Sequence, residues 1–173
     1  MITQEQANYL LSLPKYIIEG EEILEFKDYS PKFPIADRIY IISKDDDAYS
    51  FFVEIQQSRK NQLKLTLHFQ EDDTNIGLLR VDYNGRHKNP ELESTDLPEM
   101  FKPYIGKWID ESHIHYFVEG YNPLVWAIPL YLDEAFSSKS FNGVNDFADV
   151  LKSFCNRINV ETNFTINVQT KLL

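Results

Sequence analysis

The sequence predicts an α+β fold: a single antiparallel, meander-like β-sheet, with an N-terminal helix and a C-terminal helix packed on its apolar face. Three observations carry this prediction. Between residues 49 and 83, apolar and polar side chains alternate along three runs, which is typical of half-buried strands. Helical periodicity occurs near both ends, at residues 3–13 and 145–158. Of the 173 residues, 43% are hydrophobic, enough for one buried core, so we expect a single domain over residues 1–173.

Local signals define the expected elements in order. Thr3 and Gln6 form a capping-box pattern, and Pro14 ends the first helix. Residues 89–110 are expected to form a long loop with one helical turn. Pro129 places the strand that contains it at an edge or at a bulge. Strands are expected at residues 23–26, 38–43, 49–57, 63–70, 77–83, 113–118, 125–132 and 160–168.

The strand runs also predict two faces, because side chains two residues apart on a strand point the same way. The expected core face consists of Phe51, Val53, Ile55, Leu63, Leu65, Leu67, Phe69, Leu79, Val81, Tyr83, Ile114, Tyr116 and Val118. The opposite, polar face consists of Phe52, Glu54, Gln56, Lys64, Thr66, His68, Gln70, Arg80, Asp82, His113, His115 and Phe117. Since consecutive strands are usually neighbours, we expect the polar set to form one concave surface.

The dipeptide Asn84-Gly85 predicts a tight hairpin turn, because both central positions of a type I′ turn need positive φ. In such a turn Asp82 lies directly opposite His87 on the same face of the sheet. A carboxylate bonded to one imidazole nitrogen fixes the tautomer and raises the basicity of the other nitrogen. The sequence therefore predicts an Asp82–His87 pair.

This polar face predicts a metal-independent, nuclease-like protein, such as a toxin-type RNase, with RNA as its partner and no cofactor. His87 is the expected general base, held by Asp82, and His113 or His115 is the expected general acid. Arg80 is expected to bind phosphate and the anionic transition state. The expected catalytic residues are Arg80, Asp82, His87, His113 and His115, and the expected substrate-binding residues are Lys64, Gln70 and Tyr121.

Other interpretations of the same residues stay open. His113 and His115 are equally consistent with polar positions on the solvent face of a sheet. They also suit a metal site, because two histidines at this spacing lie on one side of a strand and His87 or Asp82 would supply a third ligand. That spacing often arises by chance. Tryptophans at positions 108 and 126 offer stacking surfaces for bases, but tryptophan is more often a core residue.

The charge of the chain favours an alternative function from a different class. Lys and Arg number 17 against 27 Asp and Glu, which gives a net charge of −10 and no general attraction to nucleic acid. The alternative is a non-enzymatic acidic phage or mobile-element protein that binds and modulates a basic host nucleic-acid-processing factor. The acidic runs at residues 45–47, 71–73 and 91–99 motivate it.

A cytoplasmic location is expected, because no basic leader followed by an apolar run is found near Met1 and no run of about 18 apolar residues occurs. No membrane contact is expected. Cys155 is the single cysteine, and its amphipathic surroundings predict a buried apolar side chain rather than a disulfide partner. No pattern predicts the oligomeric state.

Combined motifs along the chain resemble an uncharacterised family of small bacterial and phage proteins, catalogued as a domain of unknown function. The resemblance rests on the stretches Thr3 to Ala7, Arg80 to Pro90, His113 to Tyr121, Trp126 to Leu130 and Phe147 to Asn159. It covers nearly the whole chain and implies no particular activity. Two departures reduce the phosphate-binding patch: residues 71–73 are acidic where a second arginine is expected, and the loop over residues 91–112 is longer and more acidic than in the family pattern.

Overall fold

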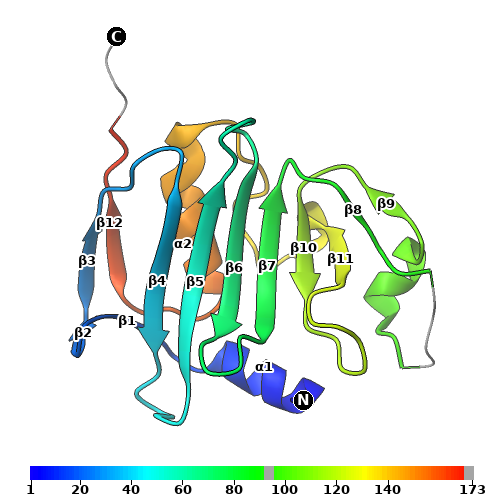
Figure 1. Ribbon diagram of the computed structural model, residues 1–173, viewed down its shortest axis with the longest axis horizontal. Helices are drawn as coiled ribbons and strands as arrows, with labels where there is room; N and C mark the ends of the chain where they lie inside the picture. The colour runs from blue at the N-terminus through cyan, green and yellow to red at the C-terminus, as the bar shows by residue number, and fades with distance from the viewer. Residues whose placement is uncertain (92–95, 170–173) are drawn as a thin grey trace.

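The computed structural model describes residues 1–91 and 96–169, where an eight-stranded antiparallel sheet carries one α-helix near each end of the chain (Figure 1). The predicted fold class is confirmed. Within these residues, no helix has both the length and the apolar composition needed to cross a membrane. In chain order the elements are α1 (Gln4–Ser12), β1 (Tyr16–Glu19), β2 (Glu22–Leu24), β3 (Phe26–Tyr29), β4 (Ala36–Ile42), β5 (Ser50–Gln57), β6 (Leu65–Glu71), β7 (Gly77–Tyr83), β8 (His87–Lys88), the 3-10 helix η1 (Glu99–Tyr104), β9 (Trp108–Ile109), β10 (His113–Tyr116), β11 (Trp126–Pro129), η2 (Leu130–Leu132), η3 (Val144–Asp146), α2 (Phe147–Arg157) and β12 (Asn163–Ile166).

The strand order in the large sheet is β11-β10-β7-β6-β5-β4-β1-β2. Strands β4 to β7 follow one another as an antiparallel meander, as predicted, and β10 pairs with the far edge of β7. Two short ribbons lie outside this sheet: β8 pairs with β9, and β12 pairs with β3 in parallel. The expected C-terminal strand therefore exists but does not join the large sheet, whereas β1, which no expected strand covers, does join it.

Both helices contribute to the core on one face of the sheet. At the start of α1, Gln6 N donates to Thr3 Oγ1 (3.1 Å) and Thr3 N donates to Gln6 Oε1 (2.9 Å), which confirms the predicted capping box. Helix α2 lies behind the sheet in Figure 1 and buries Cys155, as predicted. Its buried apolar residues are Phe147, Val150, Leu151 and Phe154.

Burial confirms the predicted apolar face of the sheet, where Phe51, Ile55, Leu67 and Val81 are inaccessible to solvent. The assignment of Leu63 to this face is wrong, because its side chain is 47% exposed. Strand β6 begins two residues later, so Leu63 lies in the preceding turn, where strand alternation does not apply.

The region expected as a long loop contains η1, as the predicted helical turn, and the short strand β9, which was not predicted; residues 92–95 lie outside the described residues. Strand β11 is an edge strand, in agreement with its Pro129. Trp126 is fully buried, as expected, but the core assignment of Trp108 is wrong. Its side chain is 52% exposed, with the Arg86 guanidinium 3.9 Å from the centre of its ring system.

Candidate functional site

Strand register places the predicted polar residues in two rows that cross β6, β7 and β10. In one row Asp82 pairs with Thr66 on one side and with His113 on the other. In the next row Arg80 pairs with His115, and also with a fourth histidine on β6. The two rows share a face of the sheet because, on each strand, the residue in one row lies two positions along the chain from the residue in the other row. The predicted polar face is therefore confirmed for these residues. The assignment of Phe117 to it is wrong, because β10 ends at Tyr116 and the Phe117 side chain is buried in the hydrophobic core.

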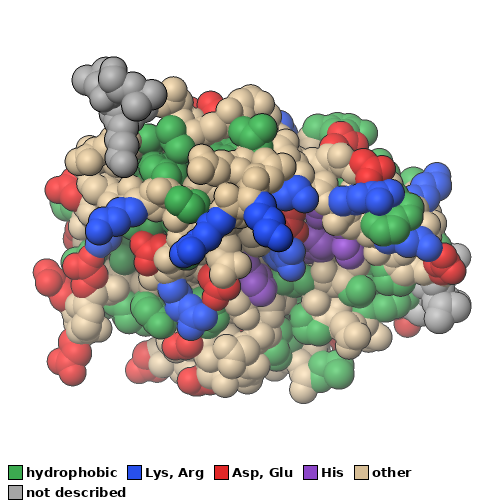
Figure 2. Space-filling view, turned by 45° about the horizontal axis from the view of Figure 1, so that its top comes forward, with side chains coloured by type: hydrophobic (Ala, Val, Ile, Leu, Met, Phe, Trp, Pro, Cys, Tyr) green, Lys and Arg blue, Asp and Glu red, His purple; other side chains and the backbone are tan. Residues whose placement is uncertain are grey.

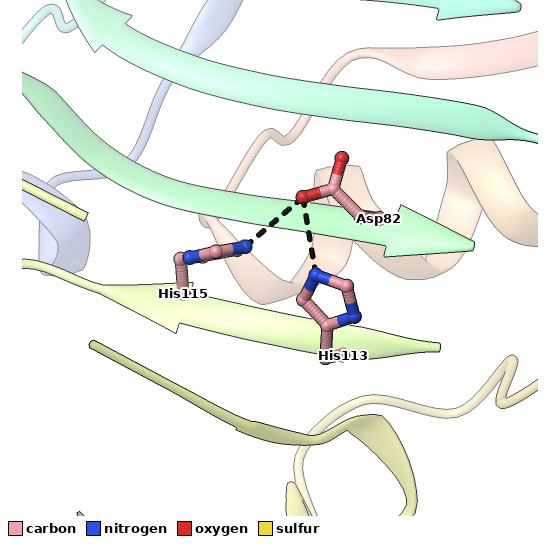
Figure 3. Close-up of side chains that lie close together, drawn as sticks. All are labelled: Asp82, His113 and His115. Carbon is pink, nitrogen blue, oxygen red and sulfur yellow. Dashed lines mark hydrogen bonds and ion pairs between the residues drawn. The ribbon is translucent and has the colours of Figure 1, made fainter. Parts of the chain in front are cut away.

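The carboxylate of Asp82 lies at the centre of the cluster. Its Oδ2 atom is 3.0 Å from His115 Nε2 and 3.5 Å from His113 Nε2, and Figure 3 shows both rings of β10 directed at this oxygen of β7. The other oxygen, Oδ1, accepts hydrogen bonds from Thr66 Oγ1 (2.6 Å) and Arg80 Nη2 (3.1 Å). Arg80 Nε also lies 2.9 Å from Oδ2, but its N–H is not aligned for a hydrogen bond.

Backbone carbonyl groups hold the other nitrogen of each ring. His113 Nδ1 lies 2.7 Å from Glu111 O, and His115 Nδ1 lies 2.8 Å from Leu124 O. Because a carbonyl oxygen only accepts, each neutral ring carries its proton on Nδ1 and directs the lone pair of Nε2 toward Asp82. Each of these three buried residues offers one ligand atom, and the three atoms lie within 4.8 Å of one another, so the residues could hold a metal ion.

The predicted Asp82–His87 pair is wrong. The chain does not return along β7 after Asn84, because that edge of β7 is occupied by β10. Asn84 has φ +57° but Gly85 is not in the positive region, and Asn84 N donates to Ser112 Oγ (3.0 Å). His87 lies on β8 and its Nε2 donates to Val125 O (2.9 Å).

His87 still reaches the cluster from a different direction. The centre of its ring is 4.6 Å from that of His115 and 5.8 Å from that of His113. All three rings line one pocket of about 450 Å³. The structure therefore brings together the five predicted catalytic residues, although the sequence argument linked His87 to the wrong partner.

The pocket is locally cationic in a chain whose net charge is −10. Lys64, Arg80 and Arg86 line it, and among the described lining residues Asp82 is the one acidic side chain. Figure 2 shows histidine side chains on this face below a band of Lys and Arg side chains. Such a surface attracts anions at short range despite the overall charge.

Burial and neighbouring charges set the protonation of the cluster. Burial by itself raises the pKa of Asp82, but the neighbouring rings of His113 and His115, the charge of Arg80 and the hydrogen bond from Thr66 outweigh it and hold that pKa far below its usual range. Burial lowers the pKa of His115, against the raising effect of Asp82. Burial and the neighbouring His115 also lower the pKa of His87. At neutral pH, Asp82 is therefore ionised, and His87 and His115 are neutral.

Two of the predicted substrate-binding residues lie outside this pocket. Gln70 Nε2 donates to His68 Nδ1 (3.1 Å), and burial lowers the pKa of His68 to about 4. Tyr121 packs edge-on against Trp126 with ring centres 5.5 Å apart. Sequence reasoning assigned no role to Thr66, although its position on the polar face, opposite Asp82, is the signal that identifies it.

Comparison with known proteins gives a family but no activity. Residues 2–160 match a family model described as "Family of unknown function (DUF6978)". This match covers every residue of the pocket. No curated protein and no solved structure matches the chain.

Proposed function

The chain belongs to this family of unknown function, and we propose from its site that it is a metal-independent, nuclease-like protein that cleaves RNA. The observation that supports this proposal most strongly is the pocket itself, where three imidazoles, two arginines and a lysine converge in an otherwise acidic protein. Cations bind a phosphodiester and stabilise the charge of its transition state, and imidazoles transfer protons near neutral pH.

In the proposed reaction, the phosphate lies against Arg80 and Lys64. His87 is the general base, because its Nε2–H donates to Val125 O and leaves the lone pair on Nδ1. Nδ1 takes the proton of the ribose 2′-OH, the 2′-oxygen attacks phosphorus, and the bond from phosphorus to the 5′-oxygen breaks. The products are a 2′,3′-cyclic phosphate and a 5′-OH.

We assign the general acid to His113, which in its doubly protonated form donates the Nε2 proton to the departing 5′-oxygen. The His87 and His113 ring centres are 5.8 Å apart, the wider of the two gaps from His87, and base and acid must lie on opposite sides of a phosphate. Asp82 is a positioning residue, because its carboxylate oxygen faces the Nε2 atoms of His113 and His115.

The test uses purified protein and an end-labelled single-stranded RNA in the presence of EDTA. Wild-type protein is expected to produce 2′,3′-cyclic phosphate ends, and His87→Ala and His113→Ala are each expected to reduce the rate by roughly 100-fold or more. His68→Gln is the matched control, because this histidine shares the sheet face but does not line the pocket. Absence of cleavage by excess wild-type protein, or equal rates for all variants, contradicts the proposal.

The acidic composition supports a second candidate, a non-enzymatic protein that binds a basic host factor. This candidate predicts association that weakens with salt and is unchanged in a variant with alanine at positions 87, 113 and 115. Retrieval of one defined basic protein by wild type and variant alike, with no RNA cleavage, favours it. Loss of that association in the variant contradicts it.

A further inference from the structure

We propose that Asp82, His113 and His115 form a binding site for a divalent transition-metal ion, for which Zn²⁺ is the probe. Binding would use Oδ2 of the carboxylate and Nε2 of each ring. The binding itself does not depend on the proposed RNA cleavage, because it follows from the geometry of these three side chains.

The distances from the Asp82 carboxylate to the two rings are close to those around a tetrahedral ion. Zn²⁺ binds imidazole nitrogen and carboxylate oxygen at about 2.0–2.2 Å, so two ligand atoms of a tetrahedral site lie roughly 3.3–3.5 Å apart. Asp82 Oδ2 is 3.0 Å from His115 Nε2 and 3.5 Å from His113 Nε2, and all three atoms lie within 4.8 Å of one another. The two distances from Asp82 Oδ2 are within a few tenths of an ångström of this spacing, and the two rings would turn toward a bound ion to close the third distance.

Outer contacts orient every proposed ligand, which is an independent feature of built metal sites. His113 Nδ1 and His115 Nδ1 are held by backbone carbonyls, which leaves both Nε2 lone pairs directed inward. Thr66 Oγ1 and Arg80 Nη2 hold Oδ1 of the carboxylate, and Oδ2 faces the rings with Arg80 Nε 2.9 Å away. The three side chains are 2–9% exposed, so their positions are fixed by packing.

An unprotonated Nε2 that faces a carboxylate oxygen at 3.0 Å is repulsive unless a cation lies between them. A proton on Nε2 removes this repulsion, and a metal ion bound by both groups also removes it. Three protein ligands leave a fourth position of the ion for water or an anion, as in catalytic rather than structural zinc sites. The cationic pocket borders the three residues and supplies access to that position.

Arg80 opposes metal binding, because its guanidinium carries positive charge beside Asp82. This makes one substitution informative for both proposals. Arg80→Gln is expected to tighten Zn²⁺ binding, because it removes the like charge, but to slow RNA cleavage, because it removes a phosphate contact.

A bound ion would occupy Nε2 of His113, the nitrogen from which the proposed general acid donates its proton. Zn²⁺ is therefore expected to inhibit cleavage, and this consequence, unlike the binding, rests on the proposed function. His87 is not one of the three ligands, so His87→Ala is expected to keep its affinity for Zn²⁺ while losing cleavage.

The experiment titrates metal-stripped, full-length protein with Zn²⁺ in competition with a chromophoric chelator, and follows the shift in melting temperature in parallel. Wild type is expected to bind one ion per chain. His113→Ala, His115→Ala and Asp82→Asn are each expected to lower the affinity by more than the roughly 10- to 100-fold typical of outer-shell changes. His68→Gln and His87→Ala are expected to retain it. Far-UV circular dichroism identifies any variant that does not fold.

The outcomes separate the two proposals. One ion bound through these residues without any RNA cleavage supports the metal site and overturns the proposed function. Cleavage that is abolished by EDTA and restored by Zn²⁺ also supports the metal site and overturns the proposed metal-independent function, because the reaction would then need the ion. No binding by wild type, or equal affinity in wild type and folded Asp82→Asn, overturns the metal site.

Discussion

Replacement of Lys15 by methionine is expected to produce a change in stability that depends on pH. The side chain of Lys15 is fully buried, and its ammonium group donates to Leu11 O (3.0 Å), Leu13 O (2.8 Å) and Ile158 O (2.8 Å). These bonds join the end of α1 to the end of α2. Burial lowers the pKa of Lys15 from 10.5 to about 7.

The size of the effect follows from this shift. Between pH 7 and pH 10.5 the unfolded chain carries a proton on Lys15 that the folded chain releases, so the free energy of unfolding rises with pH in this window. One pKa unit corresponds to about 1.36 kcal/mol. Integration of this pH dependence from pH 7 to pH 9.5 raises the free energy of unfolding of the wild type by roughly 3 kcal/mol. The methionine variant lacks this increase.

Urea denaturation of wild type and Lys15→Met at several pH values between 7 and 9.5 measures this difference. The contributions of other titrating groups to the pH dependence cancel in the difference between the two proteins, because both proteins contain those groups. Lys60→Met, at an exposed position, is the matched control and is expected to give a difference that does not vary with pH. Parallel stability curves for wild type and Lys15→Met would refute the reasoning and would mean that the three carbonyl bonds keep the ammonium charged in the folded state.

Two further substitutions test the packing around the site. Gly77→Ala is expected to destabilise the protein by about 1–3 kcal/mol, because the added Cβ would lie 2.5 Å from Leu124 Cδ1 and 2.9 Å from His68 Nε2. Urea denaturation measures this loss, and an unchanged midpoint would show that these side chains move aside. Asn89→Ala is expected to cost roughly 2–4 kcal/mol, because the Asn89 side chain accepts from Ala127 N (2.9 Å) and donates to Ala127 O (2.8 Å), and both groups would stay buried without that partner. Thermal unfolding measures this loss, and a melting temperature equal to that of wild type would contradict it.

Most of the candidate site could be predicted from alternation along strands. Arg80 and Asp82 are two residues apart on one strand, and His113 and His115 are two residues apart on another, so each pair shares a face whatever the surroundings. Alternation cannot specify which residues pair across strands. The contact between Asp82 and His115 depends on the register of β7 against β10, which are separated by about thirty residues of chain.

The position of His87 could not be predicted from its local sequence. Asn84-Gly85 is a strong hairpin signal, and a hairpin there would have placed His87 opposite Asp82. A strand has only two edges, however, and both edges of β7 are taken by β6 and β10. The chain after Gly85 therefore leaves the sheet and pairs as β8 with β9. Competition between a local turn and a distant strand is decided by the packing of the whole sheet.

By itself, the sequence determined the properties that depend on a few neighbouring residues: the capping box at Thr3, the strand periods, the amphipathic C-terminal helix and the polar face with its histidines. Only the tertiary structure decided that Asp82 contacts His113 and His115 rather than His87, and that backbone carbonyls direct both Nε2 atoms toward one oxygen. The physical reason is distance along the chain. Local periodicity sets the face of the sheet on which a side chain lies. The residues that it contacts across the sheet depend on which distant segment of the chain pairs with its strand, and that pairing is decided by the burial of apolar surface and by backbone hydrogen bonds.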